Sequence, residues 1–173
     1  MSPEFSRPVS LDRIGVTGLD CTVTAKPDEC AALALRMALP AIASLICRFH
    51  LQPAPGGGVA AVGILTASVT QTCVVTLDEF PAKVAEHFTI RFVPAGLESV
   101  DDDPDSVDEI PFTGTTLDLG EAAAEQLALA LPPYPRKPGI DDPAADVAET
   151  APATPENPFA KLAFLRPDAR QKN

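Results

Sequence analysis

Apolar and polar side chains alternate along three consecutive segments of the chain, and this pattern is the strongest constraint on the fold. Between residues 59 and 77 the odd positions are mostly apolar, and the even positions mostly carry hydroxyl groups. Residues 44–51 and 83–93 alternate in the same way, with Leu45 and Phe88 on their apolar sides. A period of two is typical of a strand with one buried face. Because short turns separate the segments, the sequence predicts a curved antiparallel sheet.

Two helices are expected beside this sheet. The first begins at Pro27, is followed by two acidic residues that suit the positive end of a helix dipole, and ends before Pro40. The second begins after Asp118, with Glu121 three residues later at the spacing of a capping box, and stops at a pair of prolines. The predicted fold class is α+β. Either a curved antiparallel sheet or a partly open barrel would pack against the two helices.

The net charge of −11 is distributed unevenly along the 173 residues. Residues 1–97 hold eight acidic and seven basic side chains, whereas residues 98–156 hold fifteen acidic and two basic ones. Residues 157–173 hold four basic side chains and one acidic side chain. A uniformly acidic surface would repel nucleic acid. Because the charges of residues 1–97 nearly cancel, this half could carry a local basic face. The net charge of the whole chain therefore does not exclude an RNA partner.

Composition divides the chain into a domain, a linker and a terminal segment. Residues 1–135 are expected to form a single α+β domain that contains an acidic loop at 98–109. Residues 136–156 are acidic and rich in proline, which predicts a disordered linker. Residues 157–173 form a short apolar and basic segment that either docks on its own domain or binds a partner.

The sequence contains neither a membrane span nor a secretory signal that can be recognised. No apolar run approaches the roughly 20 residues that a membrane helix needs. The N-terminal sequence MSPEFSRPVSL has no basic flank followed by an apolar stretch. We therefore expect a cytoplasmic protein without a membrane partner.

Motifs that carry catalytic chemistry are missing from the sequence. There is no P-loop, dinucleotide-binding, zinc-protease or serine-hydrolase motif. The two histidines, His50 and His87, fall on polar strand faces and would share a site only if their strands were neighbours, still without a nucleophile. The cysteines are too far apart for a metal knuckle and are expected to be buried free thiols: Cys21, Cys30, Cys47 and Cys73. We expect no catalytic site, no metal and no cofactor.

Four sequence blocks occur together in an order that is specific to one family. They are EFSRPVSLDRIG near the N-terminus, VTQTCVVTLDEFPAKVAEHFTIRF in the long strands, IPFTGTTLDLGEAAAEQLALALPPYPRKPG around the second helix, and NPFAKLAFLR near the C-terminus. The chain resembles the YceD family of large ribosomal RNA subunit accumulation proteins, in its alphaproteobacterial branch. The resemblance spans residues 4–166.

This resemblance implies a cytoplasmic, non-enzymatic ribosome-biogenesis factor that supports synthesis, processing or stability of 23S (large-subunit) ribosomal RNA. The chain departs from many relatives at a CxxC motif, where it has Cys73 but Thr76 at the second position. Many relatives also have further cysteines after the second helix, where this chain has the sequence PRKP. A metal role in those relatives is therefore not transferred to this chain.

The implied partner is large-subunit ribosomal RNA or a pre-ribosomal particle. Basic and apolar side chains are the candidate contacts, namely Arg48, Arg91, Arg136, Lys137, Phe159, Lys161, Phe164 and Arg166. An alternative is an acidic adaptor or holdase, in which the segment 98–156 would bind a basic ribosomal protein and affect the RNA indirectly. Complementary charge would accelerate that encounter.

Overall fold

The computed structural model describes residues 3–98 and 107–140 of the chain. Met1–Pro138 form one compact unit, and Gly139–Asn173 form a second unit of which only two residues are described. All the described helices and strands belong to the first unit.

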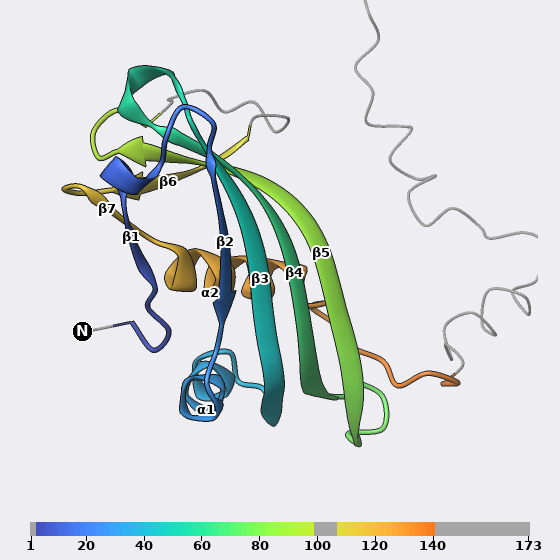
Figure 1. The fold of residues 1–173 in the computed structure, drawn as a ribbon. Helices are drawn as coiled ribbons and strands as arrows, with labels where there is room; N and C mark the ends of the chain where they lie inside the picture. Colours follow the sequence, from blue (N-terminus) through green and yellow to red (C-terminus); the bar gives the residue numbers. More distant parts are fainter. Residues whose placement is uncertain (1–2, 99–106, 141–173) are drawn as a thin grey trace, which may run out of the picture. The chain divides into compact units, whose positions relative to one another are not determined.

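A five-stranded sheet is the main layer of the described fold (Figure 1). Its strands follow the spatial order β2 (Leu19–Thr24), β3 (Ala41–Pro53), β4 (Val59–Thr72), β5 (Glu79–Pro94) and β6 (Asp108–Phe112). Neighbours from β2 to β5 run antiparallel, whereas β6 pairs in parallel with the end of β5. The sheet bends strongly but does not close, because β2 and β6 remain at its two edges. The predicted α+β fold with a curved sheet is therefore confirmed in its open form.

The alternation along the strands separates a covered face from an open face of the sheet. Odd residues of β3 and β4 and even residues of β5 point to the core, where Leu45, Leu65 and Ile90 are at most 1% exposed. The residues between them point to the other side, which no helix of the described fold covers. Gln71 is a polar residue on the covered face and is only 4% exposed.

Both helices pack on the covered face, and in Figure 1 α2 crosses behind the strands. The first helix, α1 (Pro27–Arg36), begins at the predicted proline and buries Leu33. The second, α2 (Leu119–Ala130), buries Leu119 and Leu127 completely and ends just before its two prolines. Both helix starts and the proline stop of α2 therefore lie where the sequence predicts them.

Asp118 caps α2 as predicted, but the expected capping box does not form. The Asp118 Oδ1 atom accepts hydrogen bonds from the backbone N–H groups of Gly120 (3.0 Å) and Glu121 (3.3 Å). Glu121 does not return to the cap. Its carboxylate instead pairs with Arg36 at the end of α1, with 2.6 Å between Oε1 and Nη2. The two helices are joined by this ion pair because the fold brings the end of α1 beside the first turn of α2.

A second sheet of two strands lies beside the start of α2. Its strands are β1 (Pro8–Ser10) and β7 (Thr116–Asp118), which run antiparallel. Short 3-10 turns follow β1 at Leu11–Arg13 and precede β4 at Pro55–Gly57. The N-terminal segment is therefore anchored far along the chain, at the start of α2.

Two boundaries differ from the sequence prediction or lie beyond the described residues. Strand β6 begins at Asp108, inside the acidic loop predicted for 98–109, because pairing with β5 orders this end of the loop. The rest of that loop, at 99–106, is outside the described residues. Only 136–140 of the linker predicted at 136–156 are described, and the segment 157–173 is outside the described part of the chain.

Candidate nucleic-acid interface

The open face is built from four neighbouring strands whose register places their side chains in rows. One row across the sheet reads Thr22, Arg48, Ile64 and His87 from β2 to β5. The flanking rows place His50 beside Val62 on one side, and Ile46 beside Thr66 on the other. Lys83 and Arg91 extend the same face along β5. Local alternation decides which side chains face outward, and the sheet register makes them neighbours.

Basic groups on this face differ in whether they have partners. The side chains of Arg48, Lys83 and His87 make no hydrogen bond or ion pair with any described residue. Arg91 lies 3.8 Å from a carboxylate oxygen of Glu109 on β6. Two of the three Lys or Arg side chains therefore have no partner among the described residues, in a chain whose net charge is −11.

His50 is held by its neighbours on β2 and β3. Its Nδ1 atom lies 2.6 Å from the carboxylate of Asp20, and its Nε2 atom lies 3.1 Å from the side-chain amide nitrogen of Gln52. An amide that donates to Nε2 leaves the ring proton on Nδ1, where it points to Asp20. Both ring nitrogens are engaged, so His50 is a surface side chain of fixed orientation.

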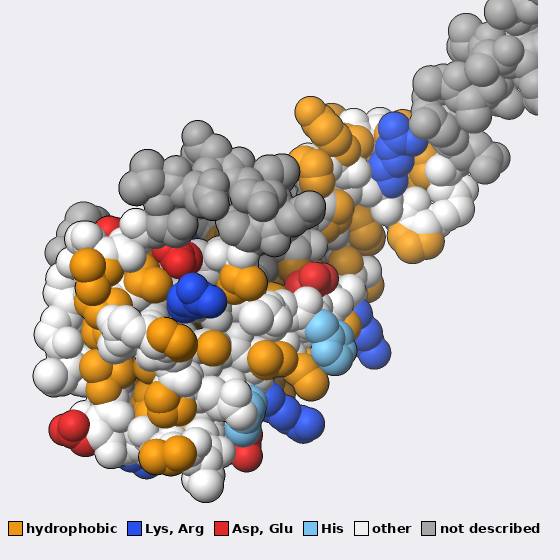
Figure 2. Space-filling model, turned by 90° about the horizontal axis from the view of Figure 1, so that it is seen from above, with side chains coloured by type: hydrophobic (Ala, Val, Ile, Leu, Met, Phe, Trp, Pro, Cys, Tyr) orange, Lys and Arg blue, Asp and Glu red, His pale blue; other side chains and the backbone are white. Residues whose placement is uncertain are grey.

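Apolar side chains lie between these polar groups. Ile46 is 36% exposed, Ile64 41% and Val62 51%, and all three lie in the middle of the open face on β3 and β4. Figure 2 shows both histidines close to Lys or Arg side chains and to exposed hydrophobic ones. A shallow hollow of about 300 Å³ lies between Arg48, His50 and Ile64. The face combines cations, hydrogen-bond donors and apolar surface.

The shared histidine site considered from the sequence does not form. It required neighbouring strands, but β4 lies between the strand of His50 and that of His87. His87 lies across the sheet from Arg48 instead, with Ile64 between them. The described residues contain no cluster of three or more His, Cys, Asp or Glu side chains that could hold a metal ion.

The other two described candidates, Arg136 and Lys137, lie away from the open face. They follow α2 and approach the turn that joins β4 to β5. The Lys137 ammonium group is 3.5 Å from the carboxylate of Asp78 in this turn, and the Val74 amide donates to the Pro135 carbonyl at 2.9 Å. The candidates Phe159, Lys161, Phe164 and Arg166 lie outside the described residues.

The same turn holds a thiol in an unusual environment. Cys73 is buried, and its sulfur accepts hydrogen bonds from the backbone N–H of Lys137 and from the hydroxyl and backbone N–H of Thr76. These donors stabilise the thiolate and lower the pKa of Cys73 to about 6. Thr76 thus contacts the cysteine from three positions later in the chain. Sequence reasoning missed this arrangement because the Lys137 donor lies far along the chain.

The remaining three cysteines are free thiols in apolar surroundings. Desolvation raises the pKa of Cys47 to about 12 and also raises the pKa values of Cys21 and Cys30. Cys30, Cys47 and Cys73 are buried and Cys21 is partly buried, in agreement with the expected buried free thiols.

Comparison with known proteins then shows the family. Residues 61–166 match the family model described as Large ribosomal RNA subunit accumulation protein YceD. The chain belongs to this family. The match covers more than half of the chain and includes most of β4 and all of β5, β6, β7 and α2. The YceD family is named for a role in the accumulation of large-subunit ribosomal RNA.

Comparisons with curated proteins and with solved structures add no further family or fold assignment. Neither a curated protein nor a solved structure matches the chain. Among the described residues there is no helix of sufficient length and apolar character to cross a membrane.

One basic residue of the open face, Lys83, was not among the sequence candidates. Its odd position on β5 places it on the same face as Arg91, so the alternation alone contained this signal. That no described residue pairs with it could be known only from the packed structure.

Proposed function

We propose that this YceD-family protein is a cytoplasmic, non-enzymatic ribosome-biogenesis factor that supports synthesis, processing or stability of 23S ribosomal RNA by contacting that RNA. The observation that carries the proposal is the open face, on which Arg48 and Lys83 have no acidic partner among the described residues. Family membership supplies the class of RNA.

The chemistry of this face suits an RNA backbone. Unpaired Lys and Arg side chains attract phosphates and release counterions, which makes the resulting affinity dependent on salt. His87 and the threonines of the face add hydrogen-bond donors. No Phe, Tyr or Trp side chain lies in the rows described, so base stacking is not invoked. Contacts to phosphate and sugar position a protein without reading sequence.

Charge reversal on the open face tests the contact. The double variant Arg48→Glu with Lys83→Glu should weaken binding of purified 23S RNA at least about tenfold and reduce the salt slope by about 1.4, the value for two phosphates on single-stranded RNA. The matched control reverses Arg13 and Lys26, which are exposed but lie outside the open face. If both variants lost the same RNA affinity, the loss would be explained by net charge alone, and this interface would be refuted.

The non-enzymatic part of the proposal has its own test. Prolonged incubation of the protein with 23S RNA, with and without added Mg²⁺, should leave the RNA length distribution unchanged on a denaturing gel. RNA cleavage by the protein that is lost when an open-face residue is substituted would contradict the non-enzymatic assignment.

An adaptor for a basic ribosomal protein is the second candidate. It is favoured by the fifteen acidic residues in the segment 98–156, against two basic ones. Capture of the full chain from cells with and without nuclease separates the two functions. Loss of large-subunit particles after nuclease supports direct RNA contact, whereas retention of one or two ribosomal proteins supports the adaptor.

A further inference from the structure

Strand β5 has a long free edge. It spans Glu79–Pro94 and pairs with β4 from Glu79 to Phe92, whereas β6 pairs only with its last residues, from Ile90 onward. From residue 79 to residue 89, no described strand lies on its outer side (Figure 1). The register with β4 has no bulge in this stretch. An edge of this kind is a template for pairing with another strand.

The position of Pro81 indicates which backbone groups face outward. A proline inside a sheet is accommodated where its nitrogen points away from the ladder. Strand alternation then directs the N–H and C=O groups of Lys83, Ala85 and His87 outward as well. Ala95, which has the same parity, donates its N–H to Phe112 of β6 at 2.9 Å, on the outer side of β5. The free edge therefore offers three consecutive outward donor and acceptor pairs.

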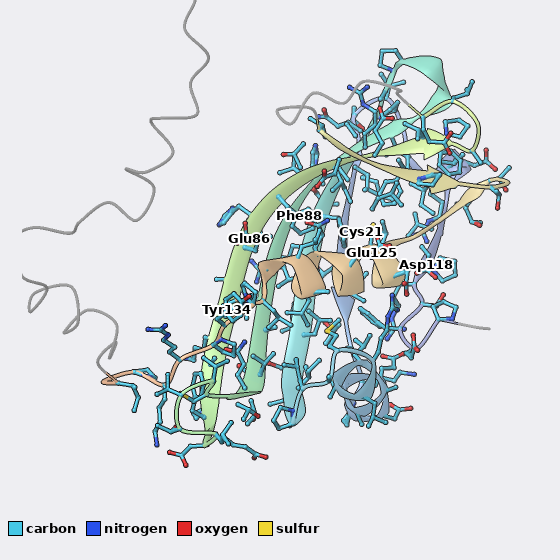
Figure 3. The ribbon with its side chains drawn as sticks, turned by 180° about the vertical axis from the view of Figure 1, so that it is seen from behind. Cys21, Glu86, Phe88, Asp118, Glu125 and Tyr134 are labelled. Carbon is cyan, nitrogen blue, oxygen red and sulfur yellow. The ribbon has the colours of Figure 1, made fainter. Side chains whose placement is uncertain are left out.

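A hollow of about 450 Å³ runs along this edge. It is lined by the consecutive residues Ala82, Lys83, Val84, Ala85 and Glu86, so it follows the strand rather than one of its faces. Its other wall is the chain that leaves α2. In Figure 3, Glu86 on β5 and Tyr134 on that chain are both seen on the side of the sheet that α2 covers.

Side chains around the edge indicate the chemistry of a partner strand. On the side of the hollow, Phe80 and Val84 supply apolar surface, and Tyr134 is 76% exposed. On the side of the open face, Lys83 and His87 flank Ala85 and have no acidic partner among the described residues. An added strand would alternate between these two environments.

We propose that the edge of β5 between Lys83 and Thr89 binds an extended protein segment that pairs as an additional strand, with apolar side chains toward the hollow and acidic side chains toward Lys83 and His87. Main-chain hydrogen bonds provide the affinity in strand addition, and the alternating side chains provide the specificity. The partner is a protein because the outward groups are a strand ladder. This site shares Lys83 and His87 with the proposed RNA contact, but its main-chain groups lie on the strand edge, so it does not rest on that contact.

Alternating peptides test the site on the full-length chain. The probe is a seven-residue peptide of alternating valine and glutamate, and the matched control replaces each glutamate with lysine. The glutamate peptide should bind at least about tenfold more tightly. Its binding should slow hydrogen exchange of the Lys83, Ala85 and His87 amides, for which no described residue provides a backbone acceptor. Failure of both peptides to bind at millimolar concentration would refute the proposal.

Two pairs of variants locate the contact. Ala85→Pro removes an outward N–H and leaves the β4 ladder intact, so it should abolish peptide binding, whereas Ala85→Thr retains that N–H and should bind normally. Lys83→Glu should reverse the preference between the two peptides, and it provides the test if the proline variant does not fold. Unchanged peptide binding in a folded Ala85→Pro variant, or binding of a uridine oligonucleotide that Ala85→Pro also abolishes, would overturn the assignment to a protein strand.

Discussion

Replacing Asp118 with alanine should destabilise the protein more than the loss of an ordinary helix cap. One carboxylate oxygen, Oδ1, accepts hydrogen bonds from the backbone N–H groups of Gly120, Glu121 and Arg7, the last at 2.7 Å. The other, Oδ2, accepts the hydroxyl of Ser6. The side chain thus caps α2 and also anchors the N-terminal segment, more than a hundred residues away in sequence.

The expected magnitude follows from these bonds. Loss of an aspartate cap costs about 1–2 kcal/mol. The two bonds to the N-terminal segment add about 1 kcal/mol each, because their donors lose a partner in a partly buried site. The sum is about 3–4 kcal/mol for Asp118→Ala. In a unit of this size that lowers the melting temperature by about 10 °C.

Chemical denaturation and calorimetry measure this loss. Asp118→Asn is the matched control, because its side-chain oxygen can still accept the three backbone bonds, and it should cost about 1 kcal/mol. The backbone amide of Arg7 should exchange its hydrogen faster in the alanine variant than in the native protein, and this change should be absent in the asparagine variant. A loss below about 1 kcal/mol for Asp118→Ala, or equal losses for both variants, would refute the anchoring role.

Three other substitutions have outcomes that follow from the structure. Gly63→Ala should cost about 1–2 kcal/mol by denaturant titration, because a Cβ there would collide with the ring of Phe88 and break its edge contact with Phe49. Ultraviolet titration should show one thiolate with a midpoint near pH 6 that Cys73→Ser removes, because the other thiols have raised pKa values. Since the folded-state pKa lies below its ordinary value of 9.0, stability relative to Cys73→Ser should rise from about pH 6 to about pH 9 and be unchanged below that window. Leu127→Ala should cost about 2–5 kcal/mol, since this side chain is fully buried, and a smaller loss would contradict its place in the core.

Strand faces and helix starts could be predicted because they depend on neighbours in sequence. Alternation placed Arg48 and Arg91 on solvent-facing sides, and Asp118 was predicted as a cap before its contacts were known. The capping partner was predicted wrongly, since Glu121 pairs with Arg36 of the other helix. A distant cation competed with the local backbone donor, and sequence spacing contains no information about that cation.

The sequence by itself determined which side chains could share a face, because a strand alternates with a period of two and a helix ends at proline. Only the tertiary structure decided which strands are neighbours. It placed β4 between the two histidines, brought the Lys137 amide to Cys73, and left one side of β5 without a partner among the described strands. The physical reason is that strand pairing and side-chain contacts join residues that are distant along the chain, whereas periodicity and capping act within a few residues.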